Sequence, residues 1–143
     1  GKKWISKEGN IFISIFFQIK NNKISFADFS LLNPYIIKSV LKKFSKYKIK
    51  IKLPNDLLIK NKKLSGILQE VIEFKKIKYL IIGIGINTVV APQHKNFDSI
   101  SLNKCSDKDV KNENIINEIK LAYEKILFGL TKHKILYLKK SFN

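Results

Sequence analysis

The chain has 143 residues, 45% of them hydrophobic, which is enough for one domain with a packed core. Its 28 Lys and Arg residues against 11 Asp and Glu give a net charge of +17, and the lysines are spread along nearly the whole chain. That distribution favours a solvated surface with a general attraction for ATP and acidic partners over a dedicated nucleic-acid site. No apolar run is long enough to span a bilayer and no signal-peptide region opens the chain, so we expect no membrane partner.

The single cysteine, Cys105, cannot form an internal disulfide, and it predicts a reducing, cytoplasmic location. It has no neighbouring His or acidic motif that would favour a nucleophilic role. His94 and His133 lack the spacing of metal ligands, so we interpret both as surface or packing residues.

Apolar patterning predicts the first elements in chain order. Residues 11–19 are rich in Ile and Phe between Asn-containing turns and predict a strand buried on at least one face. Residues 30–46 change to helical spacing, with Ser30 or Asn33 as the cap and Pro34 in the first turn. This amphipathic helix should pack on a sheet, and we assign it no catalytic role.

Residues 47–53 return to alternation and lead into the stretch around which the chain is organised, residues 52–70. A Pro-Asn-Asp corner and a polar turn at residues 61–62 predict strand, loop, strand, tight turn, strand. Asp56 offers an oxygen of the kind Mg²⁺ prefers beside phosphates, and Lys63 offers a cation for a phosphoryl or carboxylate oxygen. Gly66 marks a bulge or a close backbone approach. On pattern alone, an ordinary turn with a solvated lysine is the favoured interpretation.

The second half of the chain completes an alpha+beta layered domain. Residues 79–90 predict a strand pair or one long strand, in which Gly83 and Gly85 either expose backbone to a flat ligand or admit a packed helix. A polar loop follows, and residues 113–130 have helical periodicity. Residues from Lys132 onward predict a second short helix.

Three segments resemble, in order and spacing, signatures of the biotin protein ligase catalytic domain: KIKLPND at residues 50–56, KLSGILQE at 63–70 and IGIGIN at 82–87. The opening residues 1–6 and 9–14 resemble the segment just after that family's biotin-binding loop. The resemblance implies an α+β fold with a mixed or antiparallel sheet, of the biotin/lipoate ligase type related to class II aminoacyl-tRNA synthetases. It also implies that residues 1–143 are a single, incomplete catalytic domain, N-terminally truncated.

The activity implied by the resemblance has two steps. The biotin carboxylate attacks the α-phosphate of Mg²⁺-bound ATP to give biotinyl-AMP and pyrophosphate. A lysine of a biotin carboxyl carrier protein of acetyl-CoA carboxylase then attacks this mixed anhydride and takes the biotin as AMP leaves. Lys63 would be the catalytic cation that touches biotin and ATP, with Asn55 and Asp56 at ATP and Asp56 at the metal. The remaining implied contacts are Gly66 and Ile67 with biotin, and Trp4 and Asn87 with adenine.

The sequence also departs from the family pattern. Leu53 stands where the family usually has Trp, which could loosen the wall of the biotin pocket, and the Arg-containing part of the biotin-binding loop is absent. A non-catalytic module that binds biotin or a carrier domain is therefore an alternative. A lipoate-type ligase and a basic nucleic-acid-binding domain rank behind it. We expect no sequence-specific DNA binding, because the helix-turn-helix of repressor-type relatives is absent, and a homodimer is left open.

Overall fold

The computed structural model describes residues 7–19 and 25–129, and Trp4 and the helix expected from Lys132 onward lie outside these ranges. The strands are β1 (Ile11–Gln18), β2 (Ile49–Lys52), β3 (Asp56–Ile59), β4 (Lys62–Phe74) and β5 (Ile77–Ile86). The helices are α1 (Phe26–Leu41), the short 3-10 helix η1 (Leu102–Cys105) and α2 (Asn112–Gly129).

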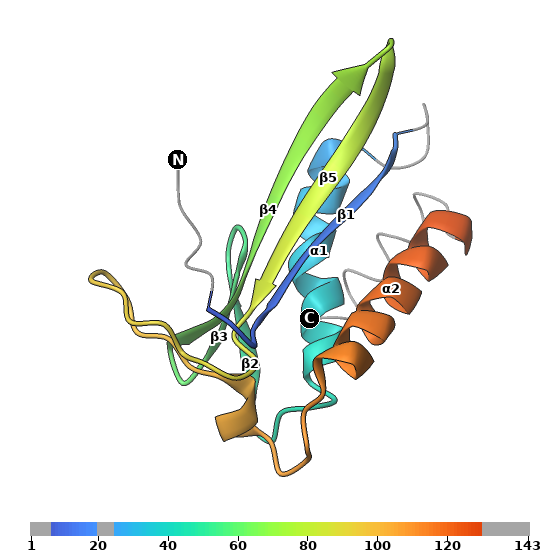
Figure 1. The fold of residues 1–143 in the computed structure, drawn as a ribbon. Coiled ribbons are helices and arrows are strands. Elements are labelled where there is room, and N and C mark those ends of the chain that lie inside the picture. The colour runs from blue at the N-terminus through green and yellow to red at the C-terminus, as the bar shows by residue number, and fades with distance from the viewer. Residues whose placement is uncertain (1–6, 20–24, 130–143) are drawn as a thin grey trace.

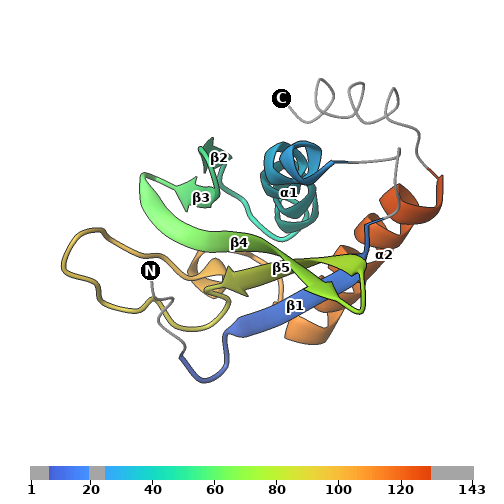
Figure 2. The ribbon, with the colours of Figure 1, turned by 90° about the horizontal axis from the view of Figure 1, so that it is seen from above.

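The five strands form one sheet in the order β1-β5-β4-β3-β2, and every neighbouring pair is antiparallel. The long hairpin of β4 and β5 extends beyond the short strands β2 and β3, which lie at its lower end in Figure 1. Seen from above, α1 lies across one face of the sheet and α2 runs beside it (Figure 2). The predicted α+β fold with an antiparallel sheet and packed helices is confirmed.

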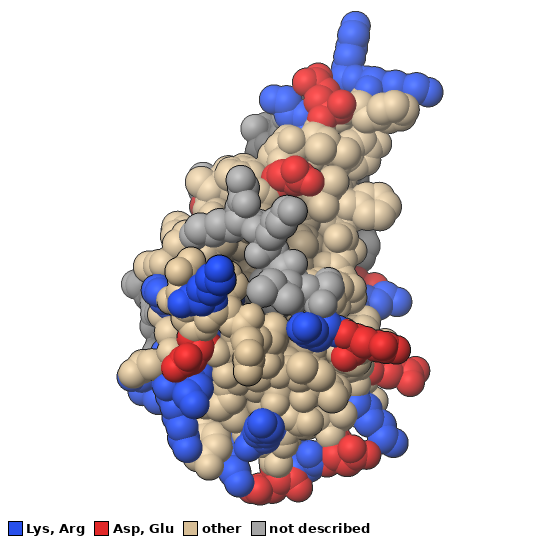
Figure 3. Space-filling model, turned by 60° about the vertical axis from the view of Figure 1, so that its left-hand side comes forward, with Lys and Arg blue, Asp and Glu red and all other residues tan. Residues whose placement is uncertain are grey.

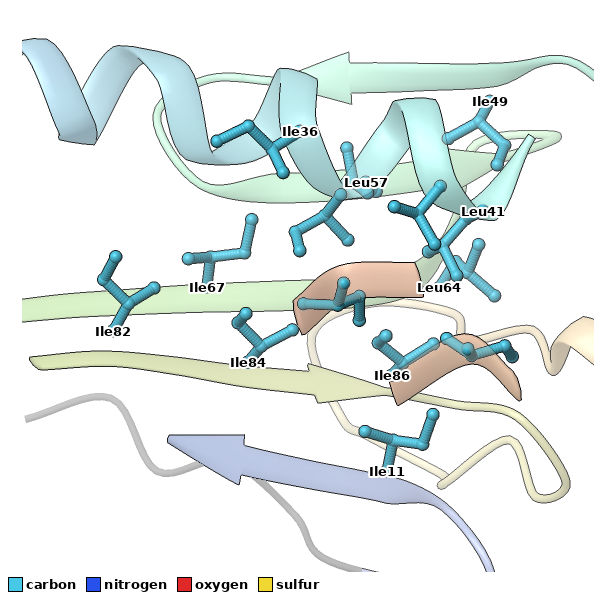
Figure 4. Close-up of a cluster of buried hydrophobic side chains, with 14 of the residues drawn as sticks. Ile11, Ile36, Leu41, Ile49, Leu57, Leu64, Ile67, Ile82, Ile84 and Ile86 are labelled. Atoms are coloured by element: carbon cyan, nitrogen blue, oxygen red, sulfur yellow. The ribbon is translucent and has the colours of Figure 1, made fainter. Parts of the chain in front are cut away.

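The core lies between the helices and the face of the sheet that we call the inner face. Alternate residues of β5 point into it, and Ile82, Ile84 and Ile86 are at most 1% exposed. Side chains from all five strands meet those of α1 there (Figure 4). Because side chains alternate along a strand, the residues between these isoleucines point to the opposite, outer face. The inner face is thus reserved for packing, and the outer face carries the side chains that take no part in this core.

Helix α1 begins earlier than its sequence pattern predicts. Ser25 caps it: its Oγ accepts a hydrogen bond from the Asp28 N–H at 3.1 Å, and the Asp28 carboxylate accepts one from the Ser25 N–H at 3.2 Å. The predicted caps Ser30 and Asn33 are therefore wrong, and Pro34 lies inside the helix instead of in its first turn. The capping box satisfies the first orphan N–H groups, and burial of the apolar face offsets the hydrogen bond that Pro34 cannot donate.

The strand predictions hold with small shifts at the ends. The predicted strand at residues 79–90 is one strand, β5, which ends at Ile86, and the β3–β4 turn lies one residue earlier than expected. Lys60 and Asn61 occupy that turn with φ angles of 50° and 62°. Positive φ at both central residues suits a two-residue hairpin turn, because its twist matches that of the flanking strands.

Candidate functional site

One row of residues crosses the outer face through all five strands. The strand registers place Lys52 opposite Asp56, Asp56 opposite Gly66, Gly66 opposite Gly85, and Gly85 opposite Phe12. Directly paired residues of antiparallel strands share a face. The row therefore carries charge on β2 and β3, a strip without side chains on β4 and β5, and an aromatic ring on β1.

An irregularity in β4 brings Lys63 to the same face as Gly66. The two residues are an odd number of positions apart, and a regular strand would direct them to opposite faces. The register shifts between Leu57, which pairs with Ser65, and Leu58, which pairs with Lys63, so Leu64 has no partner across the pair. This extra residue is a β-bulge, and it turns the Lys63 side chain to the outer face. The sequence predicted a bulge or close approach at Gly66, whereas the bulge lies two residues earlier.

Lys63 and Asp56 form an ion pair at the start of their strands. The Lys63 Nζ lies 2.9 Å from Asp56 Oδ1, and the two side chains are 18% and 24% exposed. Both groups are thus mostly removed from water, where a charge pair interacts more strongly than at an open surface. The arrangement places a cation and a carboxylate next to the strip of Gly66 and Gly85. A ligand carboxylate or phosphate on that strip would meet the ammonium group.

The loop after β5 returns to cover Lys63, which the sequence did not indicate. The Lys63 N–H donates to the Asp98 carbonyl at 2.8 Å, and the Ile100 N–H donates to the Lys63 carbonyl at 3.0 Å. The Lys63 ammonium lies 5.0 Å from the centre of the Phe97 ring, and His94 stacks on that ring at 4.0 Å. The Phe97 ring therefore forms one side of the site, next to the Lys63 ammonium group. No periodicity or motif in this polar loop could have revealed the contact.

Asn55 ties the corner before β3 to β4. Its Nδ2 donates to the Ile67 carbonyl at 2.8 Å, and its carbonyl accepts from the Ile67 N–H at 2.9 Å. These bonds fix the loop that presents Asp56. They also engage the backbone groups of Ile67, whose side chain is 3% exposed on the inner face. A ligand would consequently meet this part of β4 across the face of Gly66.

Asn87 lies directly after β5 and is 1% exposed. Its Nδ2 donates to the Lys63 carbonyl at 3.1 Å, and its backbone N–H donates to the Leu64 carbonyl at 2.9 Å. Asn87 therefore joins the end of β5 to the residues that carry the bulge. Among the described residues, its Oδ1 accepts one long hydrogen bond, at 3.5 Å from Asn10 Nδ2.

Gly83 and Gly85 both point to the outer face, opposite the helices. The interpretation that they admit a packed helix is therefore wrong. A Cβ added at Gly83 would meet nothing closer than the Leu68 carbonyl oxygen at 3.9 Å, so that position is not small for packing reasons. Gly83 pairs across the strands with Leu68, which is 52% exposed. This geometry suits the alternative reading, a surface on which a flat ligand lies.

Within residues 7–19 and 25–129, no three His, Cys, Asp or Glu side chains gather as a metal site. Asp56 is a single carboxylate, which fits a Mg²⁺ ion that takes its other ligands from phosphates and water. No helix in the described part of the chain is long and apolar enough to cross a membrane. In the view of Figure 3, most of the charged side chains lie near the margin of the molecule, and many uncharged side chains lie between them.

These features define an α+β domain whose outer sheet face carries a lysine–aspartate pair beside a glycine strip. The model of the Biotin/lipoate A/B protein ligase family matches residues 1–87. The chain is 34% identical over 89 residues to the bifunctional ligase/repressor BirA of Escherichia coli K12, covering 61% of this chain and 28% of BirA. It is 31% identical to BirA of Bacillus spizizenii, covering 94% of this chain and 45% of that protein.

A solved structure of biotin protein ligase from Aquifex aeolicus, in complex with biotin and ATP, has a TM-score of 0.68 and 25% identity to the chain. The match covers 89% of this chain and 53% of the Aquifex chain. The chain thus spans about half the length of that ligase and less of the BirA proteins. It belongs to the Biotin/lipoate A/B protein ligase family, as its three sequence signatures predicted.

Proposed function

We propose that the chain takes part in ATP-dependent biotinylation of an acceptor lysine on a biotin carboxyl carrier protein, through biotinyl-AMP. The observation that carries the proposal is the Lys63–Asp56 pair beside the strip of Gly66 and Gly85. Family membership and the similarity to a ligase solved with biotin and ATP support the choice of substrates.

In the first step a biotin carboxylate oxygen bonds to the α-phosphorus of ATP, and the bond to pyrophosphate breaks. Negative charge is then shared among the carboxylate, the phosphorus oxygens and the leaving group. Lys63 supplies a positive charge that Asp56 and Phe97 hold in place. This positive charge stabilises the negative charge of the reacting groups, and the site does not have to reorganise during the reaction. In the second step the acceptor amine attacks the acyl carbon, an amide forms, and AMP leaves. No protein nucleophile is required, so catalysis comes from positioning and electrostatics.

The remaining residues have binding roles in the proposal. Asp56 would hold Mg²⁺ together with ATP, where the ion neutralises phosphate charge, and Asn55 would keep the Asp56 loop in place. Gly66 would let the biotin ring approach the sheet, with Ile67 behind it in the core. Asn87 would use its lightly engaged carboxamide oxygen, and Trp4 its ring, to bind adenine.

The test is biotin-dependent exchange of pyrophosphate into ATP by the purified chain. Lys63→Ala should lower the exchange rate by about 100-fold or more, because the variant loses a preorganised charge at the reacting atoms. Lys62→Ala is the matched control: it removes the same charge from the adjacent, exposed residue. We expect it to stay within about twofold of the unmodified chain.

Two results would contradict the proposal, one in its catalytic residue and the other in its activity. Exchange that survives Lys63→Ala would remove Lys63 from the catalytic role. No exchange by the unmodified chain, together with biotin binding in a calorimetric titration, would indicate the non-catalytic binding module instead.

A further inference from the structure

A row of lysines follows β2, an edge strand of the sheet. Lys50 and Lys52 belong to the strand, and Lys48 precedes it at the same spacing. Ile49, between them, is 2% exposed and points to the core, so alternation directs the three lysines to the outer face. All three are exposed. We call Lys48, Lys50 and Lys52 the β2 lysine row, which spans about 13 Å at the usual rise of a strand.

The positive charge of the β2 lysine row is not neutralised by ion pairs with described residues. None of its members forms an ion pair with a described residue, whereas Lys43 and Lys46 pair with Glu118 and Asp107. Lys52 lies opposite Asp56 on β3, but that carboxylate already holds Lys63 at 2.9 Å. Lys50 lies opposite Leu58, which brings no charge. The positive charge of the row therefore attracts negatively charged molecules that approach the outer face.

The row also leads directly to the candidate site, because Lys52 is the β2 member of the cross-strand row that contains Asp56 and Gly66. A protein that binds over Lys48 and Lys50 would lie beside the Lys63–Asp56 pair. Charge at this place affects the encounter with a large substrate more than the chemistry of a small one.

We propose that the β2 lysine row is the docking surface for an acidic protein domain, which presents its acceptor lysine to the Lys63–Asp56 site. This inference rests on the proposed function and names the surface that receives the second substrate. Complementary charge raises the association rate and favours partners with an acidic surface around the acceptor.

Other occupants fit the row less well. A second copy of the chain would bring another +17 charge, and lysines on an edge strand oppose pairing between identical strands. Nucleic acid is attracted by lysine, but the chain contains no arginine for bidentate phosphate contacts. No aromatic side chain lies between the lysines of the row for bases to stack on.

The test compares two double variants with the same change of charge. Lys48→Glu/Lys50→Glu reverses the row but leaves Lys52, which adjoins Asp56. The control, Lys76→Glu/Lys78→Glu, reverses two exposed lysines at the tip of the β4–β5 hairpin, far from β2 (Figure 1). The probe is the isolated biotin-accepting domain of a biotin carboxyl carrier protein. Its Kd is measured by calorimetry at low and high salt, and pyrophosphate exchange is measured in parallel.

The row variant should bind the acceptor domain about tenfold or more weakly than the control at low salt, with a flatter salt dependence. Pyrophosphate exchange should be equal in both variants. The binding arm reports on docking even if the chain shows no exchange, so failure of the proposed function and failure of the docking surface are distinguishable.

Three outcomes would overturn the proposal. Equal loss of affinity in the row variant and the control would mean that only net charge matters. Loss of pyrophosphate exchange in the row variant alone would assign the lysines to ATP. Unchanged acceptor binding with loss of affinity for a labelled single-stranded oligonucleotide would make the row a nucleic-acid site.

Discussion

Tyr123 and Asn33 form a buried hydrogen bond whose loss should destabilise the fold measurably. The Tyr123 hydroxyl in α2 donates to Asn33 Oδ1 in α1 at 2.8 Å, and the two residues are 2% and 1% exposed. Asn33 Nδ2 in turn donates to Gln69 Oε1 on β4 at 2.6 Å. The chain of bonds therefore joins both helices to the sheet through the core.

Tyr123→Phe leaves Asn33 Oδ1 buried without this donor. An unsatisfied buried acceptor costs about 1–3 kcal/mol, which for a domain of this size lowers Tm by roughly 3–10 °C. Asn33→Leu removes the acceptor instead and leaves the hydroxyl without its partner. In the double variant neither polar atom of the pair remains, so its loss should be smaller than the sum of the single losses by about 1–2 kcal/mol.

Urea unfolding followed by circular dichroism at pH 7 measures all three variants. The control is Tyr79→Phe, because the hydroxyl of half-buried Tyr79 has no hydrogen bond to a described residue. It should change the free energy of unfolding by less than about 0.5 kcal/mol. Equal effects of Tyr123→Phe and Tyr79→Phe, or additive losses in the double variant, would refute the reasoning.

Two further predictions concern the glycine strip and the buried thiol. Gly83→Ala adds a Cβ whose nearest neighbour would be the Leu68 carbonyl oxygen at 3.9 Å, so the free energy of unfolding should change by less than about 0.5 kcal/mol. Biotin affinity should fall about tenfold or more, and unchanged affinity in a calorimetric titration would contradict the ligand surface. Burial raises the pKa of the Cys105 thiol above its ordinary 9.0, against the smaller lowering influence of Lys60 and Lys46. The unfolded chain therefore loses this proton first, and stability should fall as the pH rises above about 9. Cys105→Ala should remove that part of the fall between pH 8 and 10, measured by urea unfolding.

Local pattern was sufficient for most of the elements because each prediction used a signal confined to neighbouring residues. Alternation in residues 47–53 identified the strand that the structure has as β2, and helical spacing identified α2. The start of α1 was missed because the reading began at Ser30, where the apolar period is clear. The capping box of Ser25 and Asp28 lies one turn earlier, next to residues that resemble a turn. Capping depends on which N–H groups need partners, and the apolar period does not report that.

The candidate site was predictable in its residues but not in its assembly. Asp56 and Lys63 stand close together in the sequence, and the predicted hairpin puts them on neighbouring strands, but their ion pair was not predicted. Phe97 reaches Lys63 only because the loop after β5 returns across β4. Such a contact joins segments distant in sequence and carries no period or motif, so only the folded chain reveals it.

The bulge at Leu64 shows why residue spacing alone misleads at this site. In a regular β4, Lys63 would point to the core face whenever Gly66 pointed outward, and the cation could not adjoin the glycine strip. One extra residue reverses that relation, at the cost of a locally disrupted ladder. The Asn87 side chain donates a hydrogen bond to the Lys63 carbonyl, and the Asn87 backbone N–H donates one to the Leu64 carbonyl, so both bonds engage residues at the bulge. The stretch that gives the sheet its irregularity is thus the one that gives the site its charge.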